Sequence, residues 1–200
     1  VSSFDLTRNG EFLSRITTCL LGRHNIQNIV GISAFLLETE KLTIEELVHG
    51  VGSFKGIVRR LDRKTEKTTV PIYEGFGSSV DKARSAIEAI KLHFPHKRLV
   101  VVFEPHTFSW RNRAALPWYD TVFTGVDHVF IYKPPEHGSE THDQLTLDEI
   151  AQRISLSGMT VTPFENTATG LVELVNQAEH DDVILILSSG GMDGLLPQVI

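Results

Sequence analysis

The stretch Leu99-Val100-Val101-Val102-Phe103-Glu104 is an unbroken apolar run that ends in a carboxylate. Runs of this kind are typical of strands that are buried on both faces, as in parallel sheets. On either side of it, strand patterns at residues 60–62, 70–74, 126–132, 160–164 and 183–187 alternate with helical patterns at residues 81–93, 114–123, 147–157 and 168–179. This alternation predicts an α/β fold, a Rossmann-like and mainly parallel sheet with helices on both faces.

The amino-terminal quarter has a different pattern. Residues 2–7 and 11–19 predict two strands around the turn Arg8-Asn9-Gly10, and residues 25–37 predict a largely buried helix. Thr43 and Glu46 form a capping box for a helix at residues 44–49, which we expect to end at Gly50-Val51-Gly52-Ser53. We take this glycine-containing segment as the boundary between domains at residues 1–52 and 53–200.

Composition excludes several classes of protein. The 200 residues are 41% apolar and carry a formal net charge of −6, which predicts a globular protein without a nucleic-acid surface. Apolar runs stay below the roughly 20 residues of a membrane helix, and no signal peptide precedes them, so we expect a cytoplasmic protein with no membrane partner. The single cysteine, Cys19, fits a reducing compartment and is predicted to lie in the core.

Two segments have the composition of a nucleotide site at a hinge. The first is Gly22-Arg23-His24-Asn25-Ile26-Gln27-Asn28, whose two carboxamides lie near one face of a helix and can recognise the edge of a base. The second is Phe54-Lys55-Gly56-Ile57-Val58-Arg59-Arg60, whose guanidinium groups suit phosphates. The alternative is a helix cap with a solvent-facing amide and an ordinary surface arginine.

Ligands of open parallel sheets bind at the carboxyl ends of strands, so the loops there are candidate sites. The loop at residues 73–79 precedes a helix and is suited to an anion, although a glycine turn with Ser78 or Ser79 capping the helix is the alternative. In the segment at residues 103–111, His106, Ser109 and Arg111 are suited to an anionic acceptor and Glu104 to an amine. Alternatively, Trp110 and Phe108 pack on a helix and His106 only bonds backbone.

Metal chemistry has weak support in the sequence. His137 and His142 have Glu136 and Glu140 nearby, and His93 lies close to His96, but neither spacing falls on a predicted helix face. We therefore read these segments as solvated loops and predict no metal site. The sequence also lacks Gly-x-Ser-x-Gly, an activated Cys-His pair and a Gly-x-Gly-x-x-Gly after a strand, which disfavours hydrolases and dehydrogenases.

The order and spacing of these segments resemble the Mur ligase family, which joins amino acids or peptides to UDP-N-acetylmuramate with ATP. The resemblance implies that His24, Asn25 and Asn28 lie at the adenine and that Arg60 reaches the phosphates. Family members carry Asp-Asp-Tyr-Gly-His-His-Pro or a close relative where this chain has Glu74 to Val80, and the second aspartate holds the ribose. Glu74 is then the residue that remains for the ribose.

The resemblance also implies an acceptor site. The segment at residues 103–111 is similar to the family's Phe-x-Pro-His stretch, with Arg111 one position later than the usual arginine. The loop at residues 187–194 matches the end of the muropeptide-type branch, and its glycines allow a substrate to approach the backbone. The residues implied to bind the acceptor are Ser78, His106, Arg111, Ser188, Ser189, Met192 and Asp193.

In this family the muramoyl carboxylate attacks ATP, and the acyl phosphate then reacts with an amine, which requires Mg²⁺ and anchored phosphates. Family members hold the phosphate loop Gly-x-x-Gly-Lys-Thr and the Mg²⁺ ligands in a preceding central domain. This chain has no Gly-Lys-Thr or Gly-Lys-Ser and begins at Val1 in what reads as mid-domain. We expect a fragment, inactive alone, with residues 1–52 from the central domain, 53–200 forming the carboxyl-terminal domain, and upstream domains as its partners.

Three interpretations remain open at this point. The first is a ligase that joins L-Ala-γ-D-Glu-meso-diaminopimelate, or L-alanine, to UDP-N-acetylmuramate. The second is a degenerate, non-catalytic relative that serves as a binding module, for which Gly75 and Ser78 are the best evidence. The third is an unrelated flavodoxin-like binder of a nucleotide or a sugar phosphate, which leaves Asn25, Asn28 and Arg60 unexplained.

Overall fold

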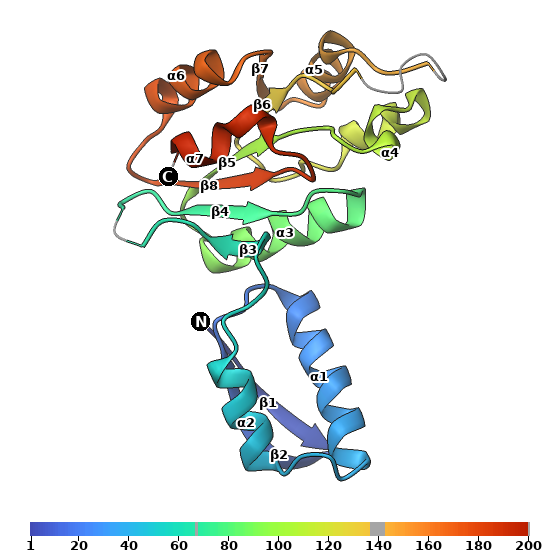
Figure 1. Ribbon diagram of the computed structural model, residues 1–200, viewed down its shortest axis with the longest axis vertical. Helices are drawn as coiled ribbons and strands as arrows, with labels where there is room; N and C mark the ends of the chain where they lie inside the picture. Colours follow the sequence, from blue (N-terminus) through green and yellow to red (C-terminus); the bar gives the residue numbers. More distant parts are fainter. Residues whose placement is uncertain (67, 137–142, 200) are drawn as a thin grey trace. The chain divides into compact units, whose positions relative to one another are not determined.

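The computed structural model describes residues 1–66, 68–136 and 143–199. It divides into two compact units, Val1–Val58 and Arg59–Ile200, which are described separately below (Figure 1). His137, Glu140 and His142, which the sequence suggested for a metal site, lie outside the described residues.

The first unit contains a hairpin that the sequence predicted. Strands β1 (Ser2–Arg8) and β2 (Glu11–Thr18) pair in antiparallel fashion. Asn9 and Gly10 have φ angles of 51° and 88°, the left-handed values that a tight hairpin turn needs. Leu6 and Ile16 pack against Leu47 of helix α2 (Ile44–Ser53) and form the small core of this unit.

The two helices of the first unit differ from the prediction. In α1 (Arg23–Glu38), Ile29 and Ser33 are the buried residues, while Ile32 and Phe35 are exposed, so the expectation of a largely buried helix was wrong. The hairpin core uses the carboxyl end of this helix, through Leu37, and leaves the remaining apolar side chains uncovered within the unit.

Helix α2 (Ile44–Ser53) begins with the predicted capping box, in which Thr43 and Glu46 bond each other's backbone. It does not end at His49, because Gly50 and Gly52 continue the helix. Two glycines cost only about 1 kcal/mol each in a helix, and packing of Leu47, Val48 and Val51 offsets this. The prediction for Cys19 was also wrong: its thiol is exposed and donates to the carbonyl of Phe54 at 3.2 Å, because the strand ends one residue earlier.

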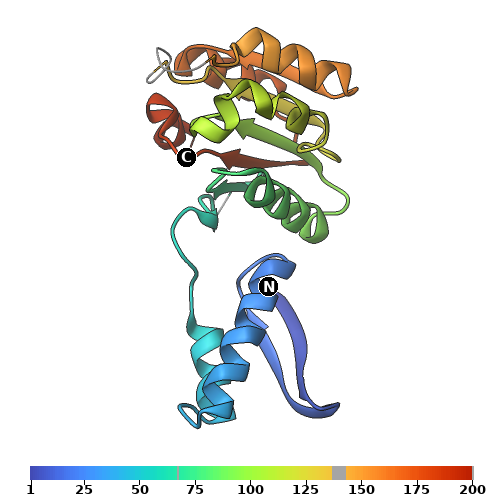
Figure 2. The same cartoon turned by 90° about the vertical axis from the view of Figure 1, so that its right-hand side faces the viewer.

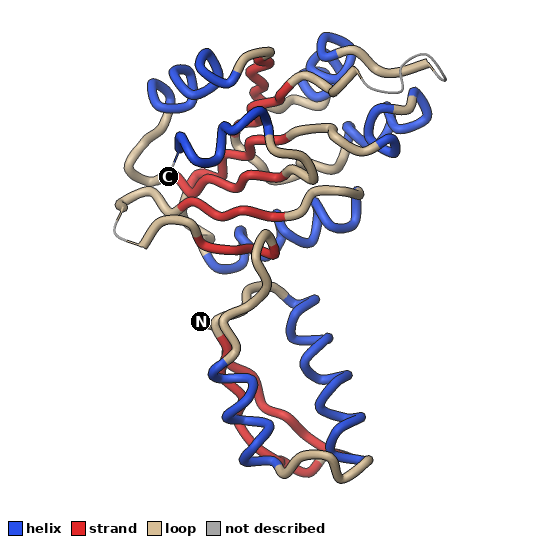
Figure 3. The backbone as a smooth tube through the Cα atoms, in the orientation of Figure 1, coloured by secondary structure: helices blue, strands red, loops and turns tan. Residues whose placement is uncertain are grey.

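The second unit confirms the predicted sheet. Its described residues form six strands in the order β3-β4-β8-β5-β6-β7. The strands are β3 (Arg60–Arg63), β4 (Ile72–Gly75), β5 (Arg98–Phe103), β6 (His128–Tyr132), β7 (Thr160–Phe164) and β8 (Asp182–Leu187). All pairs are parallel except β3 with β4 at one edge. Figure 3 draws the strands of this sheet in red.

Helices cover both faces of this sheet (Figure 2). They are α3 (Val80–His93), α4 (Phe108–Arg111), the 3₁₀ helix η1 (Arg113–Asp120), α5 (Leu147–Leu156), α6 (Thr167–Gln177), the short η3 (Met192–Gly194) and α7 (Leu195–Val199). Successive side chains of β5 point to opposite faces of the sheet, and each face has its own apolar core. Val102 packs with Leu174 and Leu195, while Phe103 contacts Trp110 and Phe123.

One predicted helix has a different form. Residues 113–120 form a 3₁₀ helix that contains Pro117, where the sequence predicted a helix at residues 114–123. Proline lacks a backbone N–H, and its ring clashes with the preceding helical turn, which disfavours a continuous α-helix over these residues. Among the described residues, every helix is too short or too polar to cross a lipid bilayer.

A buried histidine lies at the opposite end of the sheet from the candidate loops. The His128 ring stacks on Phe130 with centroids 4.4 Å apart, and its Nε2 lies 2.8 Å from Thr162 Oγ1. Burial lowers the pKa of His128, and the positive charge of Arg98 lowers it further, against an opposite effect of Asp182. The folded protein therefore favours the neutral imidazole.

The unfolded chain binds a proton at His128 more readily than the folded protein does, so stability should decrease as the pH falls below about 6.5. We expect the decrease in unfolding free energy between pH 7 and pH 5 to be smaller in His128→Gln, which cannot titrate there. Urea denaturation at each pH measures this, with His96→Gln, at an exposed position, as the control. Equal pH dependence in wild type and His128→Gln would contradict the expectation.

Candidate functional site

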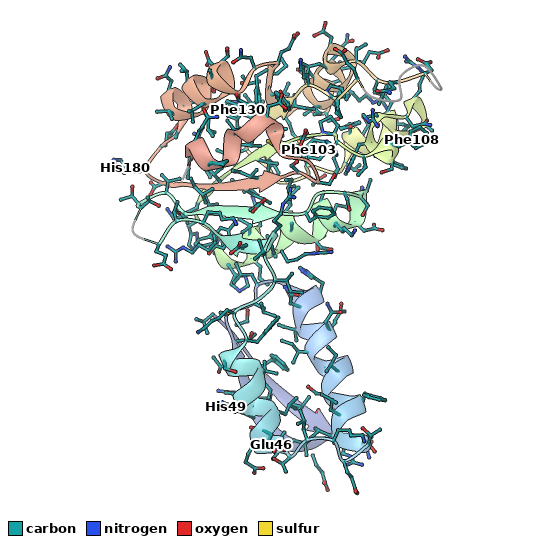
Figure 4. The ribbon with its side chains drawn as sticks, in the orientation of Figure 1. Glu46, His49, Phe103, Phe108, Phe130 and His180 are labelled. Carbon is teal, nitrogen blue, oxygen red and sulfur yellow. The ribbon has the colours of Figure 1, made fainter. Side chains whose placement is uncertain are left out.

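Three strands bring the candidate loops to one edge of the sheet. In the parallel register, Leu187 at the end of β8 pairs with Gly75 at the end of β4 and with Phe103 at the end of β5. Figure 4 labels Phe103, from which the chain continues into Glu104. The loops that follow these strands therefore start side by side, as the sequence predicted for a parallel sheet.

Glu104 connects two of these loops. The residue is 5% exposed, and its Oε2 accepts hydrogen bonds from Ser188 Oγ and, at 3.4 Å, from the Met192 amide. Its Oε1 lies 3.3 Å from His106 Nδ1. Three residues predicted for the acceptor, His106, Ser188 and Met192, thus converge on one carboxylate, whose oxygens are used within the protein.

Gly190 allows this arrangement. Its amide donates to Ser188 Oγ at 2.8 Å. A Cβ atom at this position would lie 2.4 Å from His106 Nδ1 and 2.6 Å from Glu104 Oε2, which is closer than non-bonded atoms can approach. At Gly191 the space around an added Cβ is open. The first of the two glycines is therefore required by close packing, and the second is not.

A second buried carboxylate lies at the end of β4. Glu74 is also 5% exposed. Its Oε1 accepts from Arg59 Nε at 2.7 Å and its Oε2 pairs with Lys64 Nζ at 2.8 Å. Both of its oxygens are bound by cations of the same unit. Its role toward a ribose stays a prediction.

Cations gather around the loop between β4 and α3. The guanidinium carbons of Arg59 and Arg60 lie 5.4 and 5.6 Å from the centre of the Phe76 ring, and Lys82 Nζ lies 5.6 Å from it. Lys82 also donates to Ser78 Oγ at 2.8 Å. These groups place several positive charges near the amino end of a 14-residue helix, a location that attracts anions.

The expected capping by serine does not occur at this helix. Ser79 occupies the N-cap position of α3, but its side chain makes no capping hydrogen bond. The backbone carbonyl of Ser78 instead accepts from Thr107 Oγ1 at 3.1 Å, and the carbonyl of Gly77 accepts from Trp110 Nε1 at 2.7 Å. The loop after β4 is therefore held by the loop after β5.

Two other residues predicted for the acceptor, Arg111 and Asp193, form hydrogen bonds with segments outside the loops after β4, β5 and β8. Arg111 is buried, and its Nη1 donates to the carbonyl of Pro135 at 2.9 Å and to Gln144 Oε1 at 3.1 Å. Burial lowers the pKa of Arg111. The Tyr132 hydroxyl donates to Asp193 Oδ2, and burial followed by the Asp193 charge raises the pKa of that phenol above its usual range.

Two further residues of the last loop, Ser189 and Met192, are partly or fully buried, while Asp193 is exposed. The Ser189 hydroxyl oxygen is buried and has no hydrogen-bond partner among the described residues. The Met192 side chain is part of the core beneath the sheet edge, so its amide is the group that meets Glu104. Both Met192 and Asp193 have positive φ, at 43° and 46°.

The predicted adenine residues belong to α1 of the first unit. Asn28 is exposed, and Asn25 donates from Nδ2 to the carbonyl of Leu21 at 2.8 Å. His24 lies half-buried at the start of the same helix. Their proposed cooperation with Arg60 of the second unit stays a prediction.

Among the described residues, no group of three or more His, Cys, Asp or Glu side chains is arranged to hold a metal ion. His93 Nδ1 lies 3.0 Å from the carbonyl of Ala89, one turn earlier in α3.

An α/β domain with polar loops gathered at the carboxyl ends of a parallel sheet defines a class of ligand-binding proteins. Residues 59–190 match the family model described as Mur ligase, glutamate ligase domain. The chain belongs to the Mur ligase family. The match begins at Arg59, the first residue of the second unit.

Among curated relatives, the chain is 27% identical over 192 residues to a UDP-N-acetylmuramate–L-alanine ligase of Clostridium acetobutylicum, covering 94% of this chain and 41% of the relative. The chain thus spans about two fifths of the length of the curated relatives it matches.

Solved structures show the same fold at low identity. A UDP-N-acetylmuramate–alanine ligase of Thermotoga maritima has a TM-score of 0.75 at 16% identity, covering 96% of this chain and 40% of that one. A murein peptide ligase of Psychrobacter arcticus has a TM-score of 0.64 at 18% identity, covering 93% and 38%. A ligase of Thermotoga maritima in complex with ADP has a TM-score of 0.66 at 15% identity, covering 93% and 40%.

The two adjacent glycines of the last loop provide a matched test of the site geometry. Gly190→Ala should displace His106 and Glu104 and lower the unfolding free energy by about 1–3 kcal/mol, as overpacking does. Gly191→Ala should stay within about 0.5 kcal/mol of wild type. Denaturant unfolding and the NMR shifts of the His106 ring measure both effects. Equal behaviour of the two variants would refute the close contact at Gly190.

Proposed function

We propose that the protein containing this chain is an ATP-dependent, amide-forming ligase of peptidoglycan synthesis or recycling. The reaction joins L-Ala-γ-D-Glu-meso-diaminopimelate to UDP-N-acetylmuramate. The observation that carries the proposal is the family match over residues 59–190. Residues 1–52 then belong to the central ATP-binding domain and residues 53–200 form the acceptor-binding domain.

ATP fits the charges of the described residues. Arg60 and Lys82 near Phe76, at the amino end of α3, offer positive charge to phosphates. In the proposed reaction Arg60 stabilises the charge of the transferring phosphoryl group, while Asn28 and Asn25 bind the adenine edge and His24 lies beside it. When bound, Mg²⁺ would neutralise phosphate charge, and its ligands are assigned to the upstream part of the protein.

The acceptor would bind at the edge formed by the loops after β5 and β8. His106 and Ser188 are held by the two different carboxylate oxygens of Glu104, so their positions are fixed before an acceptor arrives. Ser189, Met192 and Asp193 belong to the same loop as Ser188. Ser78, in the loop after β4, accepts through its carbonyl from Thr107 of the loop after β5. The acceptor amine would attack the acyl phosphate carbonyl and displace phosphate, forming the amide.

The second candidate function is the addition of L-alanine. The relative from Clostridium acetobutylicum, matched over 94% of this chain, carries the name of an L-alanine ligase, and this favours that branch. The proposal for a peptide acceptor rests on the loop at residues 187–194, which resembles the muropeptide-type branch.

Phosphate release by the longer protein, with UDP-N-acetylmuramate and MgATP, separates the two candidates. Under the proposal, tripeptide should give a kcat/KM at least about tenfold above that of L-alanine. This ratio corresponds to the free energy of about one additional hydrogen bond in the transition state. A preference for L-alanine would assign the protein to the other branch. Absence of release with either acceptor would support a non-catalytic binding module.

Binding of the nucleotide tests the predicted adenine site. In the longer protein, Asn28→Ala should weaken MgATP binding by about tenfold, because it removes a carboxamide that both donates to and accepts from the base. Titration calorimetry measures the affinity. Gln27→Ala, at the adjacent exposed position of the same helix, is the control and should leave it unchanged. Unchanged affinity in Asn28→Ala would remove the basis for this site.

A further inference from the structure

Arg59 contacts three segments at the sheet edge, although the proposed reaction gives it no task. It is the first residue of the second unit. Its Nε donates to Glu74 Oε1 at 2.7 Å, and its Nη2 donates to the carbonyl of Ser188 at 3.0 Å and to that of Gly190 at 2.7 Å. One guanidinium thus connects the start of β3, the end of β4 and the loop after β8.

Glu74 holds this guanidinium in place. Its side chain is 6% exposed, and Lys64 binds the other carboxylate oxygen, so the acid is fixed on both sides. Charge-assisted hydrogen bonds to a buried carboxylate are short and directional. Glu74 therefore fixes the position from which Arg59 Nη2 donates to the two carbonyls. A flexible arginine on the surface would not hold one position.

The backbone near Arg59 has an uncommon conformation. Arg59 and Leu61 have φ angles of 63° and 54°, which are unfavourable for residues that have a Cβ atom. The pairing of β3 with β4 also shifts register between Arg60 and Asp62. Such conformations persist where surrounding contacts hold them. The hydrogen bonds of the Arg59 side chain hold this backbone conformation. The same side chain therefore links the backbone at the start of the second unit to the loop after β8.

We propose that Arg59 is a positioning residue that sets the geometry of the acceptor loop at residues 188–194. By binding the carbonyls of Ser188 and Gly190, it fixes the peptide planes on either side of the Ser189–Gly190 peptide bond, whose N–H donates to Ser188 Oγ. The Ser188 hydroxyl in turn donates to Glu104. The inference rests on the proposed function of this loop in acceptor binding.

Two variants separate the guanidinium contacts from general folding. Arg59→Asn removes the guanidinium but tolerates the positive φ, since asparagine adopts left-handed conformations more readily than most residues. Arg59→Lys keeps a charge beside Glu74 but lacks the fork that reaches the two carbonyls. Arg63→Asn, an exposed arginine of β3 whose Nε bonds the carbonyl of Thr65, is the matched control.

Hydrogen–deuterium exchange of this chain tests the inference without any assumption about activity. In Arg59→Asn, amides at residues 188–192 should exchange about tenfold faster than in wild type, which corresponds to one lost hydrogen bond of a charged group. Arg59→Lys should give an intermediate increase, and amides of β5 should not change. Arg63→Asn should match wild type throughout. Wild-type exchange at residues 188–192 in both Arg59 variants would overturn the proposal, and Arg59→Lys alone carries the test if Arg59→Asn does not fold.

Kinetics of the longer protein give the second readout. Arg59→Asn should raise the acceptor KM by about tenfold while the KM for ATP stays within about twofold, a split that loss of folded protein would not produce. An equal change in both KM values, or none, would overturn the positioning role. Absence of ligase activity in wild type would refute the proposed function, and the exchange result would still decide whether Arg59 restrains the loop.

Discussion

The parallel pairing of β8 with both β4 and β5 is the constraint on which the candidate site depends. Because the three strands run the same way and end in register at Gly75, Phe103 and Leu187, the loop after β8 must start about 5 Å from each of the other two loops. Two buried carboxylates, Glu74 and Glu104, then connect these loops through charged and polar partners. The apolar strands bring the loops of the site together, and the two carboxylates hold these loops in fixed positions.

The sequence predicted this sheet well because its strands are buried on both faces and therefore apolar along their whole length, as in residues 99–103. The hairpin of β1 and β2 was predictable from Asn9 and Gly10, whose left-handed backbone suits a tight turn. The exposure of α1 within its unit was not predictable from the sequence. Apolar periodicity indicates which helix face is apolar, but it does not show whether another element of the same unit packs on that face.

Part of the candidate site was also predictable. A carboxylate directly after a buried strand, a histidine two residues later and a serine-glycine loop after the last strand all carry local signals, and the structure brings Glu104, His106 and Ser188 together. The role of Arg59 had no local signal beyond its place in an arginine pair, because its partners are 15 and about 130 residues away in sequence. The same holds for the tight packing of Gly190 against His106.

We propose that the protein containing this chain binds a purine nucleotide, with its adenine at the carboxamides of α1 and its phosphates at Arg60. A crystal structure of the longer protein with ADP and Mg²⁺ tests it most directly. In that structure Asn28 should lie within about 3 Å of the adenine edge and Arg60 at the phosphates. A nucleotide bound with neither side chain within hydrogen-bonding distance would contradict it.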